Sequence, residues 1–186
     1  MIVRIMRGLP GSGKSYFGEH VLPGIVGLEA TIVSADHFFM KDGVYSFNPK
    51  QLAIAHKVCR QKFLQALLDA RDAQDVVNGT TGESEPETLI VVDNTNTMPT
   101  EIAFYYDLAT LFTKDVEILT IEPPSIMERK DWLKQCFEKN QHGVPMKSIE
   151  AMADRMKKHK LPWYWKEKMV IREEGHFILE GKELLV

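Results

Sequence analysis

The chain has 186 residues, which predicts one domain, and its 44% hydrophobic residues are enough for a sizeable core. Its 23 basic and 26 acidic side chains give a net charge of −3, which argues against a protein that coats nucleic acid, since such proteins carry a basic excess. No apolar run is long enough to span a bilayer, and Cys59 and Cys136 have no metal-ligand spacing, so we expect reduced thiols in a cytoplasmic protein.

The first predicted elements are an alternating strand at residues 2–7 and a helix at 14–21. Between them, residues 8–15 have the sequence GLPGSGKS, which matches the pattern G-x-x-x-x-G-K-[ST] at every fixed position. A strand, a glycine loop and a helix N-terminus form an anion cradle, because backbone N–H groups point inward and the helix dipole adds positive potential. We therefore expect the chain to bind a nucleoside triphosphate. Since this loop begins at Gly8, we expect no signal peptide.

The residue types of this loop suggest what each position does. Its glycines allow backbone conformations that are closed to other residues. Lys14 is expected to reach the β- and γ-phosphates, and the Ser15 hydroxyl is expected to bind Mg²⁺. The predicted nucleotide-binding residues of the loop are Gly8, Pro10, Gly11, Ser12, Gly13, Lys14 and Ser15.

The elements that follow alternate between strands and helices. A β-branched strand is predicted at residues 30–34, then a loop at 40–48 with a turn at Asp42-Gly43, and then a long helix that Pro49 opens. The apolar stripe of this helix consists of Leu52, Ala55, His56, Cys59, Phe63, Ala66 and Leu67. Residues 78–88 are polar and are predicted to form a surface loop.

A continuous apolar run at residues 89–93 is typical of a central parallel strand. The elements expected after it are a helix from Pro99, a strand at 116–121, helices at 125–138 and 146–158, and a short hairpin at 168–186. This alternation, opened by the glycine loop, predicts an α/β fold of the P-loop NTPase type. We expect a three-layer sandwich with a central, mostly parallel sheet, a helical lid and a short C-terminal β-hairpin.

Two carboxylates lie where ligands of such a sheet bind, beyond the carboxyl ends of the strands. Asp36 follows the second strand and is the candidate to orient an acceptor hydroxyl and take its proton, in preference to the adjacent His37. The alternative is that Asp36 caps a short helix at residues 37–39. Asp93 ends a Walker B pattern and is the candidate to hold Mg²⁺ through water.

Asn94, Thr95 and Asn96 come directly after Asp93 and have two interpretations of equal weight. Their amide and hydroxyl groups either hold a substrate phosphate or satisfy a tight turn.

The segment from residue 125 to 160 is rich in cations: Arg129, Lys130, Lys134, Lys139, Lys147, Arg155, Lys157, Lys158 and Lys160. A mobile cationic helix that closes over a transferring phosphoryl group stabilises its charge and excludes water. For any single residue a solvated helix face is the preferred interpretation, whereas for the segment as a whole we expect at least one functional cation. Trp163, Tyr164 and Trp165 either stack on bases or pack the tail onto the core, and we prefer packing.

In this order and at this spacing, five motifs resemble the polynucleotide-kinase-like P-loop kinases. This family includes the kinase domain of bacteriophage polynucleotide kinase and stand-alone relatives described only as AAA-type ATPases. The motifs are residues 8–15, Ser34-x-Asp36, Tyr45-x-Phe47-x-Pro49 with Ala55-His56, residues 93–97 (DNTNT), and His142-Gly143-Val144-Pro145-x-x-x-Ile149-x-x-Met152.

The resemblance implies ATP-dependent phosphorylation of a hydroxyl, commonly the 5′-hydroxyl of a polynucleotide. It implies that Lys14 and Ser15 handle the triphosphate and Mg²⁺, that Asp36 is the general base, and that a lid at about residues 125–146 covers the donor phosphates. We accordingly expect a kinase domain over residues 1–160, with the tail at 161–186 packed on it.

One departure from the family pattern concerns the lid. Relatives usually carry Arg-Asn shortly before the His-Gly-Val-Pro motif, and here the pair is Lys139-Asn140. Lysine cannot clamp a phosphate in a bidentate fork, so Arg129 and Arg155 are further candidates for the lid cation.

The predicted site therefore has catalytic, binding and metal residues. Lys14, Asp36, Arg129 and Lys139 are the candidate catalytic residues; Asp93, Asn94, Asn96 and Arg155 join the loop in binding ATP; Ser15 and Asp93 are the metal ligands. Three functions remain open. The first is a kinase for a nucleic-acid 5′ end or nucleotide-like hydroxyl, and the second is a small-metabolite kinase, which the acidic charge favours. The third is an ATP-binding switch or interaction module, which Lys139 favours. A monomer without an obligate protein partner or membrane contact is the default.

Overall fold

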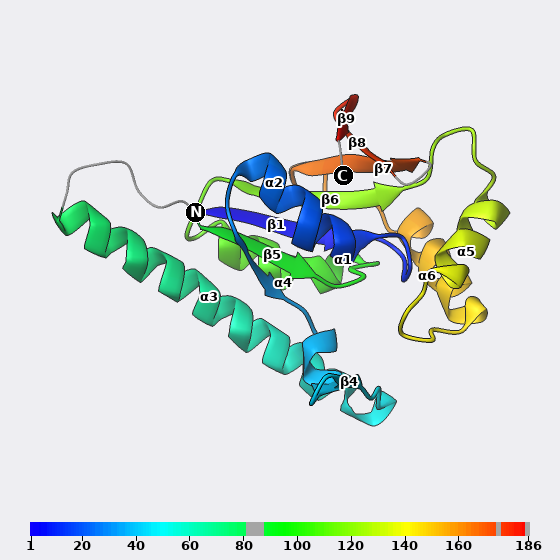
Figure 1. Cartoon of the computed structure of the whole chain (residues 1–186), viewed down its shortest axis with the longest axis horizontal. Coiled ribbons are helices and arrows are strands. Elements are labelled where there is room, and N and C mark those ends of the chain that lie inside the picture. The colour runs from blue at the N-terminus through cyan, green and yellow to red at the C-terminus, as the bar shows by residue number, and fades with distance from the viewer. Residues whose placement is uncertain (81–87, 174–175, 185–186) are drawn as a thin grey trace.

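A seven-stranded sheet with the strand order β2-β5-β1-β6-β7-β8-β9 forms the centre of the structure (Figure 1). The structure is a computed structural model that describes residues 1–80, 88–173 and 176–184. The strands are β1 (Ile2–Arg7), β2 (Ala30–Val33), β5 (Leu89–Asp93), β6 (Val116–Glu122), β7 (Glu167–Glu173), β8 (His176–Leu179) and β9 (Lys182–Leu184). The first five of these are parallel to one another, and β8 and β9 extend the sheet antiparallel at one edge, next to β7.

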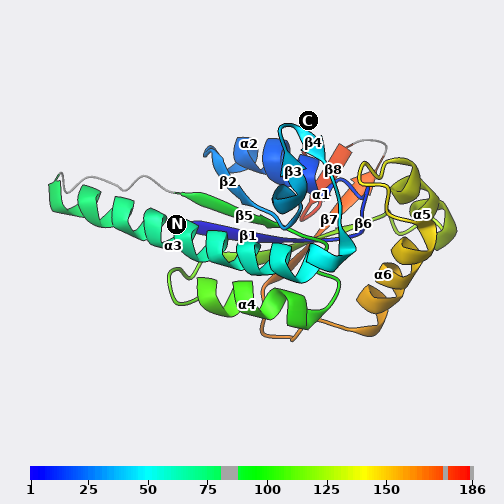
Figure 2. The same cartoon turned by 90° about the horizontal axis from the view of Figure 1, so that it is seen from below.

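Helices cover both faces of this sheet, as the sequence predicts for an α/β fold. Figure 2 shows α1 (Lys14–Tyr16) and α2 (Leu22–Val26) on one face and α3 (Leu52–Thr80) and α4 (Pro99–Ala109) on the other. The π-helical segment η1 (Phe17–Val21) joins α1 to α2. Beyond the carboxyl ends of β1 and β6 lie α5 (Arg129–Glu138) and α6 (Met146–Lys158) (Figure 1).

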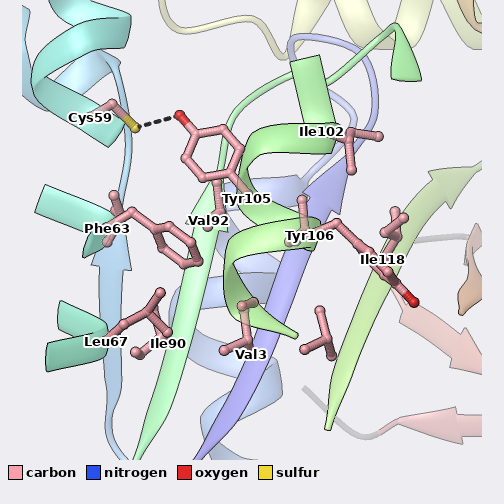
Figure 3. Close-up of a cluster of buried hydrophobic side chains, with 14 of the residues drawn as sticks. Val3, Cys59, Phe63, Leu67, Ile90, Val92, Ile102, Tyr105, Tyr106 and Ile118 are labelled. Carbon is pink, nitrogen blue, oxygen red and sulfur yellow. Dashed lines mark hydrogen bonds between the residues drawn. The ribbon is translucent and has the colours of Figure 1, made fainter. Parts of the chain in front are cut away.

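The alternation of side chains along β1 divides the core in two, because successive residues of a strand point to opposite faces. Val3 and Ile5 belong to the cluster that contains α3 and α4, whereas Ile2 and Met6 belong to the cluster that contains α1 and α2. In the first cluster, Phe63 and Leu67 of α3 face β5 (Figure 3). The second cluster also includes side chains of α5, α6 and β8, so the predicted lid and tail share this core.

The structure corrects several expected boundaries. Residues 78–80 belong to α3 rather than to a loop, and the remainder of that predicted loop up to residue 87 lies outside the described residues. Leu52, expected in the apolar stripe of α3, is 40% exposed. The helix expected from residue 125 begins at Arg129. The expected loop at 40–48 contains a small hairpin of β3 (Met40–Lys41) and β4 (Val44–Tyr45), with the predicted turn at Asp42-Gly43 between them.

The C-terminal tail is more than the expected hairpin. Its strand β7 pairs in parallel with β6 and is part of the main sheet, and a third strand, β9, follows β8. The predicted turn at residues 174–175 lies outside the described residues. Because parallel pairing is a long-range choice, the local sequence pattern could not distinguish this strand from one arm of an isolated hairpin.

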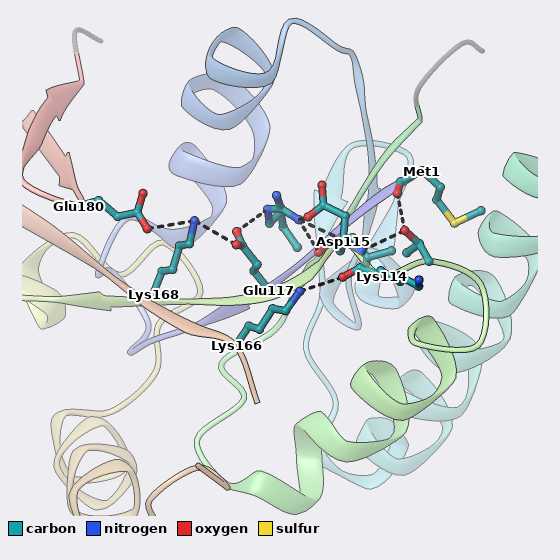
Figure 4. A network of polar contacts seen from close by, with 10 residues as sticks. Met1, Lys114, Asp115, Glu117, Lys166, Lys168 and Glu180 are labelled. Carbon is teal, nitrogen blue, oxygen red and sulfur yellow. Dashed lines mark hydrogen bonds and ion pairs between the residues drawn. The ribbon is translucent and has the colours of Figure 1, made fainter. Parts of the chain in front are cut away.

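A polar network joins the strands at the end of the sheet opposite α5 and α6 (Figure 4). Arg4 pairs with Asp115 and Glu117, and Lys168 pairs with Glu117 and Glu180. The network thereby connects β1, β6 and β7 and leaves the carboxyl end of the sheet to the site described below.

Candidate active site

The glycine loop follows β1 and ends where α1 begins at Lys14. Gly11 and Gly13 have φ angles of +74° and +97°, which favour glycine. The amide of Gly8 donates to the carbonyl of Thr95 at 3.0 Å, so the loop is also fastened to the segment after β5. This geometry leaves a curved backbone before a helix N-terminus, as an anion cradle requires.

Lys14 is the buried cation of this loop. Lys14 is 7% exposed, and its Nζ donates to the carbonyl of Leu9 at 3.2 Å. Ser12 is fully buried, and its hydroxyl has no hydrogen-bond partner among the described residues. A buried polar group without a partner is costly, so the loop is suited to a ligand that supplies one.

Asp93 and Ser15 are the two residues that the sequence predicts as magnesium ligands. Asp93 lies opposite Met6 in the register of β5 with β1 and is 7% exposed, and its Oδ1 has no partner among the described residues. Ser15 is exposed in the first turn of α1. The described residues contain no group of three His, Cys, Asp or Glu side chains that is suited to hold a metal. This donor set suits Mg²⁺, which keeps several waters and is often shared with substrate phosphates.

The end of α5 rests directly on the glycine loop. A Cβ atom at Gly11 would lie 1.9 Å from the carbonyl oxygen of Cys136 and 3.0 Å from the amide of Asn140. Burial raises the pKa of the Cys136 thiol to about 12, even though the charges of Lys14, Arg172 and Lys139 lower it. These three cations therefore lie close enough to one buried group at the loop to affect its pKa.

Arg172 is a site residue that the sequence analysis missed. Its Nη1 donates to the carbonyl of Gly11 at 3.2 Å and would lie 2.9 Å from a Cβ atom at Gly13. Burial lowers the pKa of this guanidinium, which also lies over the ring of Phe177. Arg172 belongs to β7, outside all the recognised motifs, and no local pattern connects it with the loop.

The other predicted lid cations lie elsewhere. Arg129 pairs with Asp154 and so joins α5 to α6, with both side chains exposed. Arg155 donates through Nε to the hydroxyl of Thr97 at 3.2 Å. Lys130 and Lys134 form exposed pairs with glutamates, which is the solvated-face interpretation.

Arg7, at the end of β1, fastens the end of α6 to the sheet. It is 5% exposed, pairs with Glu167 at 3.1 Å, and donates through Nη2 to the carbonyls of Met156 and His159 at 3.4 Å each. Its Nε donates to the carbonyl of Asn96 at 3.3 Å. One buried side chain thus connects the last turn of α6 with β7 and the segment after β5.

Asp36 begins the short helix η2 (Asp36–Phe39) and carries a half-exposed carboxylate. The Tyr45 hydroxyl donates to Oδ1 at 2.9 Å, and Nε2 of His142 lies 3.8 Å from Oδ2. The rings of Tyr45 and His142 are 4.3 Å apart between centroids. Burial, followed by the charge and hydrogen bond of Asp36, raises the pKa of Tyr45, which therefore remains a donor. The N-cap of η2 is Ala35 without a side-chain cap, so Asp36 does not have the alternative capping role.

Asn94 and Asn96 bond to the backbone, as the tight-turn interpretation describes. Asn94 Oδ1 accepts from the amide of Ala35 at 3.0 Å, and Asn96 Nδ2 donates to the carbonyl of Met6 at 2.7 Å. Asn96 also has a φ of +48°. The two amides hold the segment after β5 against the residues next to Asp36 and the glycine loop.

The aromatic run in the tail is divided between two environments. Trp165 is 8% exposed and stacks on Tyr106 with 5.0 Å between ring centroids, which packs the tail onto α4. Trp163 and Tyr164 are 93% and 64% exposed.

Within the described part of the chain, no helix has the length and apolar character needed to cross a membrane.

The chain is similar to known proteins in sequence and in fold. The family model described as an AAA domain matches residues 3–159. Human NEDD4-binding protein 2 is 26% identical over 154 residues, which are 83% of this chain and 8% of that protein. The AvrRxo1-ORF1:-ORF2 structure with ATP is 15% identical with a TM-score of 0.50, covering 97% of this chain and 60% of that one. Kti12 of Chaetomium thermophilum in complex with ADP-AlF3 is 13% identical, also with a TM-score of 0.50, covering 92% and 89%. At these identities the two structures share the fold.

Proposed function

Because the chain belongs to the AAA domain family and is a P-loop nucleoside-triphosphate-binding domain, we propose that it is an ATP-dependent kinase whose acceptor is the 5′-hydroxyl of a polynucleotide. The observation that carries the proposal is the carboxylate of Asp36, which is half exposed and held by the Tyr45 hydroxyl. A phosphoryl acceptor needs such a carboxylate near its hydroxyl, whereas a nucleotide-dependent switch does not.

ATP is the donor that we propose for the glycine loop. The AvrRxo1 structure contains ATP and the Kti12 structure contains ADP-AlF3, and both have this fold. Backbone amides of residues 8–15 would bind the phosphates, with Lys14 at the β- and γ-phosphates. Mg²⁺, held by Ser15 and through water by Asp93, would supply charge that neutralises the phosphates.

The chemistry at Asp36 follows from the hydrogen bond that it accepts. Tyr45 occupies Oδ1, which leaves Oδ2 to accept a hydrogen bond from the acceptor hydroxyl. As the hydroxyl oxygen bonds to the γ-phosphorus, the bond to the β,γ-bridging oxygen breaks, ADP leaves, and the proton passes to the carboxylate. Lys14 and Lys139 offset the negative charge that the transferring group spreads over its oxygens. The end of α5, packed on Gly11, limits the access of water to the donor.

The assignment of a polynucleotide as the acceptor is based on the ordered motifs. The most important of these are Asp36 after β2 and the His-Gly-Val-Pro segment, whose His142 lies beside Asp36. Transfer of label from γ-labelled ATP to 5′-hydroxyl DNA and RNA oligonucleotides tests this assignment. A nucleoside and metabolite panel assayed in parallel tests for a small-metabolite kinase.

We expect Asp36→Asn to reduce transfer by about 10²- to 10⁴-fold, because the amide cannot take the proton. ATP affinity, measured by calorimetry, should stay unchanged, and Tyr45→Phe should lower transfer less than Asp36→Asn. Asp42→Asn is the matched control, since Asp42 is exposed in the neighbouring turn and asparagine tolerates its φ of +51°. Full activity of Asp36→Asn would remove Asp36 from the mechanism. ATP binding without transfer to any acceptor would favour the switch.

A further inference from the structure

A groove of about 580 Å³ lies between α3 and α4, next to the segment that follows β5. One face of α3 contributes His56, Lys57 and Arg60, and α4 contributes Phe104 and Tyr105. Asn94 also lines the groove. None of these side chains has a part in the phosphoryl transfer described above.

The groove is connected to the proposed catalytic carboxylate through Asn94. The Oδ1 of Asn94 accepts from the amide of Ala35, whose next residue is Asp36. Both α3 and α4 begin near this edge of the sheet, and the lining residues that belong to helices lie within residues 53–64 of α3 and 101–105 of α4. A chain whose end reaches Asp36 can therefore continue along the groove.

The charge of the groove is the opposite of the charge of the chain as a whole. Lys57 and Arg60 are exposed, and His56 lies one turn before Arg60. The acidic residue of the lining is Glu101, whose carboxylate accepts from the Met98 amide and the Thr97 hydroxyl. In a protein with a net charge of −3, this local excess of cations is complementary to a phosphodiester backbone.

The groove also offers a surface for stacking. The Arg60 guanidinium lies 5.1 Å from the centroid of the Phe104 ring, which belongs to a residue that is 37% exposed. Aromatic rings and guanidinium planes both stack on bases without regard to sequence. Beneath them the floor of the groove is held in place, because the Tyr105 hydroxyl donates to Cys59 Sγ at 3.3 Å (Figure 3). Asn94 Nδ2 also donates to Cys59 Sγ, at 3.5 Å.

We propose that this groove binds the single-stranded nucleic-acid chain behind the acceptor hydroxyl, with Lys57 and Arg60 on its phosphates and Phe104 under one of its bases. The assignment rests on the proposed function and deepens it. It identifies the acceptor as a polymer held by nucleotides beyond the first one, and it places them on the α3–α4 side of the sheet rather than under the lid.

Binding of fluorescent 5′-hydroxyl oligonucleotides, measured by anisotropy over a range of salt concentrations, tests the groove directly. We expect Phe104→Leu to weaken binding by about tenfold, through lost stacking. In Lys57→Ala and Arg60→Ala the slope of log affinity against log salt should decrease by about one each. ATP affinity should remain that of the wild type in all three variants.

Two control variants carry the same kinds of change outside the groove. Lys62→Ala removes an exposed cation of α3 that does not line the groove, and Trp163→Leu removes an exposed aromatic ring of the tail. Both should bind oligonucleotide as the wild type does. In transfer assays, the groove variants should raise KM for an oligonucleotide and leave KM for a mononucleoside unchanged.

The outcomes separate this inference from the function on which it rests. Groove variants that bind oligonucleotide like the wild type, in a protein that phosphorylates oligonucleotides, would overturn the groove alone. Oligonucleotide binding that depends on the groove, without any transfer, would overturn the kinase assignment alone. A wild-type protein that neither binds nor phosphorylates oligonucleotides would overturn both.

Discussion

At the scale of single residues, Cys136 lies at the contact between α5 and the glycine loop. Its backbone carbonyl packs against Gly11, and the charges of Lys14, Lys139 and Arg172 lower the pKa of its buried thiol, which burial raises. Three cations around a neutral group would repel one another, and this charge is suited to bind polyphosphate. Cys136 itself supplies packing, since a thiol with a raised pKa is inert at neutral pH.

The free energy of unfolding should therefore depend on pH through the ionisation of the Cys136 thiol. Burial raises the pKa of its thiol from 9.0 to about 12, so the native state keeps a proton that the unfolded chain loses. The stability from this group is fully present below about pH 9 and is lost as the pH rises toward 12. Urea unfolding of the wild type and of Cys136→Ala, at about pH 8 and about pH 10.5, should show a smaller fall for the variant. An equal fall in both proteins would mean that the native thiol ionises like the unfolded one.

At the scale of elements, α5 and α6 are each fastened at the C-terminal end. The C-terminal end of α5 contacts Gly11, and the last turn of α6 accepts hydrogen bonds from Arg7. Exposed ion pairs such as Arg129–Asp154 add little, because solvent screens them. We therefore expect the close backbone contact at Gly11 to fix the position of α5 against the glycine loop.

Gly11→Ala tests this contact, and Gly27→Ala is its matched control. The two glycines have φ angles of +74° and +76°, but a Cβ atom would meet the Cys136 carbonyl at Gly11 and nothing within 4 Å at Gly27. Gly27→Ala should lower the free energy of unfolding by about 1–2 kcal/mol through backbone strain alone. Gly11→Ala should lower it further and weaken ATP binding by at least about tenfold, equivalent to ~1.4 kcal/mol.

Tryptophan fluorescence supplies an independent measure of the lid. Trp132 of α5 is 6% exposed, so displacement of the helix should shift the emission of Gly11→Ala to longer wavelength. Equal ATP affinity and equal spectra for the two variants would show that the contact has no influence on the lid.

At the scale of the whole molecule, the tail belongs to the same core as the glycine loop. Phe177 of β8 is 1% exposed and packs against Phe17, with 5.0 Å between ring centroids. A Cβ atom at Gly13 would lie 3.2 Å from the ring of Phe177. Residues C-terminal to the family match at 3–159 thus pack against the glycine loop and the helix that follows it.

We predict that Phe177→Ala lowers the free energy of unfolding by about 3–5 kcal/mol, because it leaves a cavity in the second core cluster. Thermal unfolding should remain a single transition, with a reduced ATP affinity. Trp163→Ala, at a site that is 93% exposed, should change stability by less than about 0.5 kcal/mol. Two separate transitions, with the tail melting first, would contradict one common core.

The sequence by itself determined the glycine loop, the alternation of the main strands and helices along the chain, and the placement of Asp36 after β2 and of Asp93 at the end of β5. These features are local, since they depend on residue type, spacing and period. The α/β P-loop fold predicted from them is confirmed. The roles predicted for individual site residues stay predictions until variants are measured.

Only the tertiary structure decided which side chains meet. Arg172 reaches Gly11 across 161 positions of sequence, and Asn94 meets Ala35 across 59. The pairing of β7 with β6 and the groove between α3 and α4 likewise arise from elements that pack after they form. Such contacts depend on the shape of the whole core rather than on any local pattern, and so only the folded chain could reveal them.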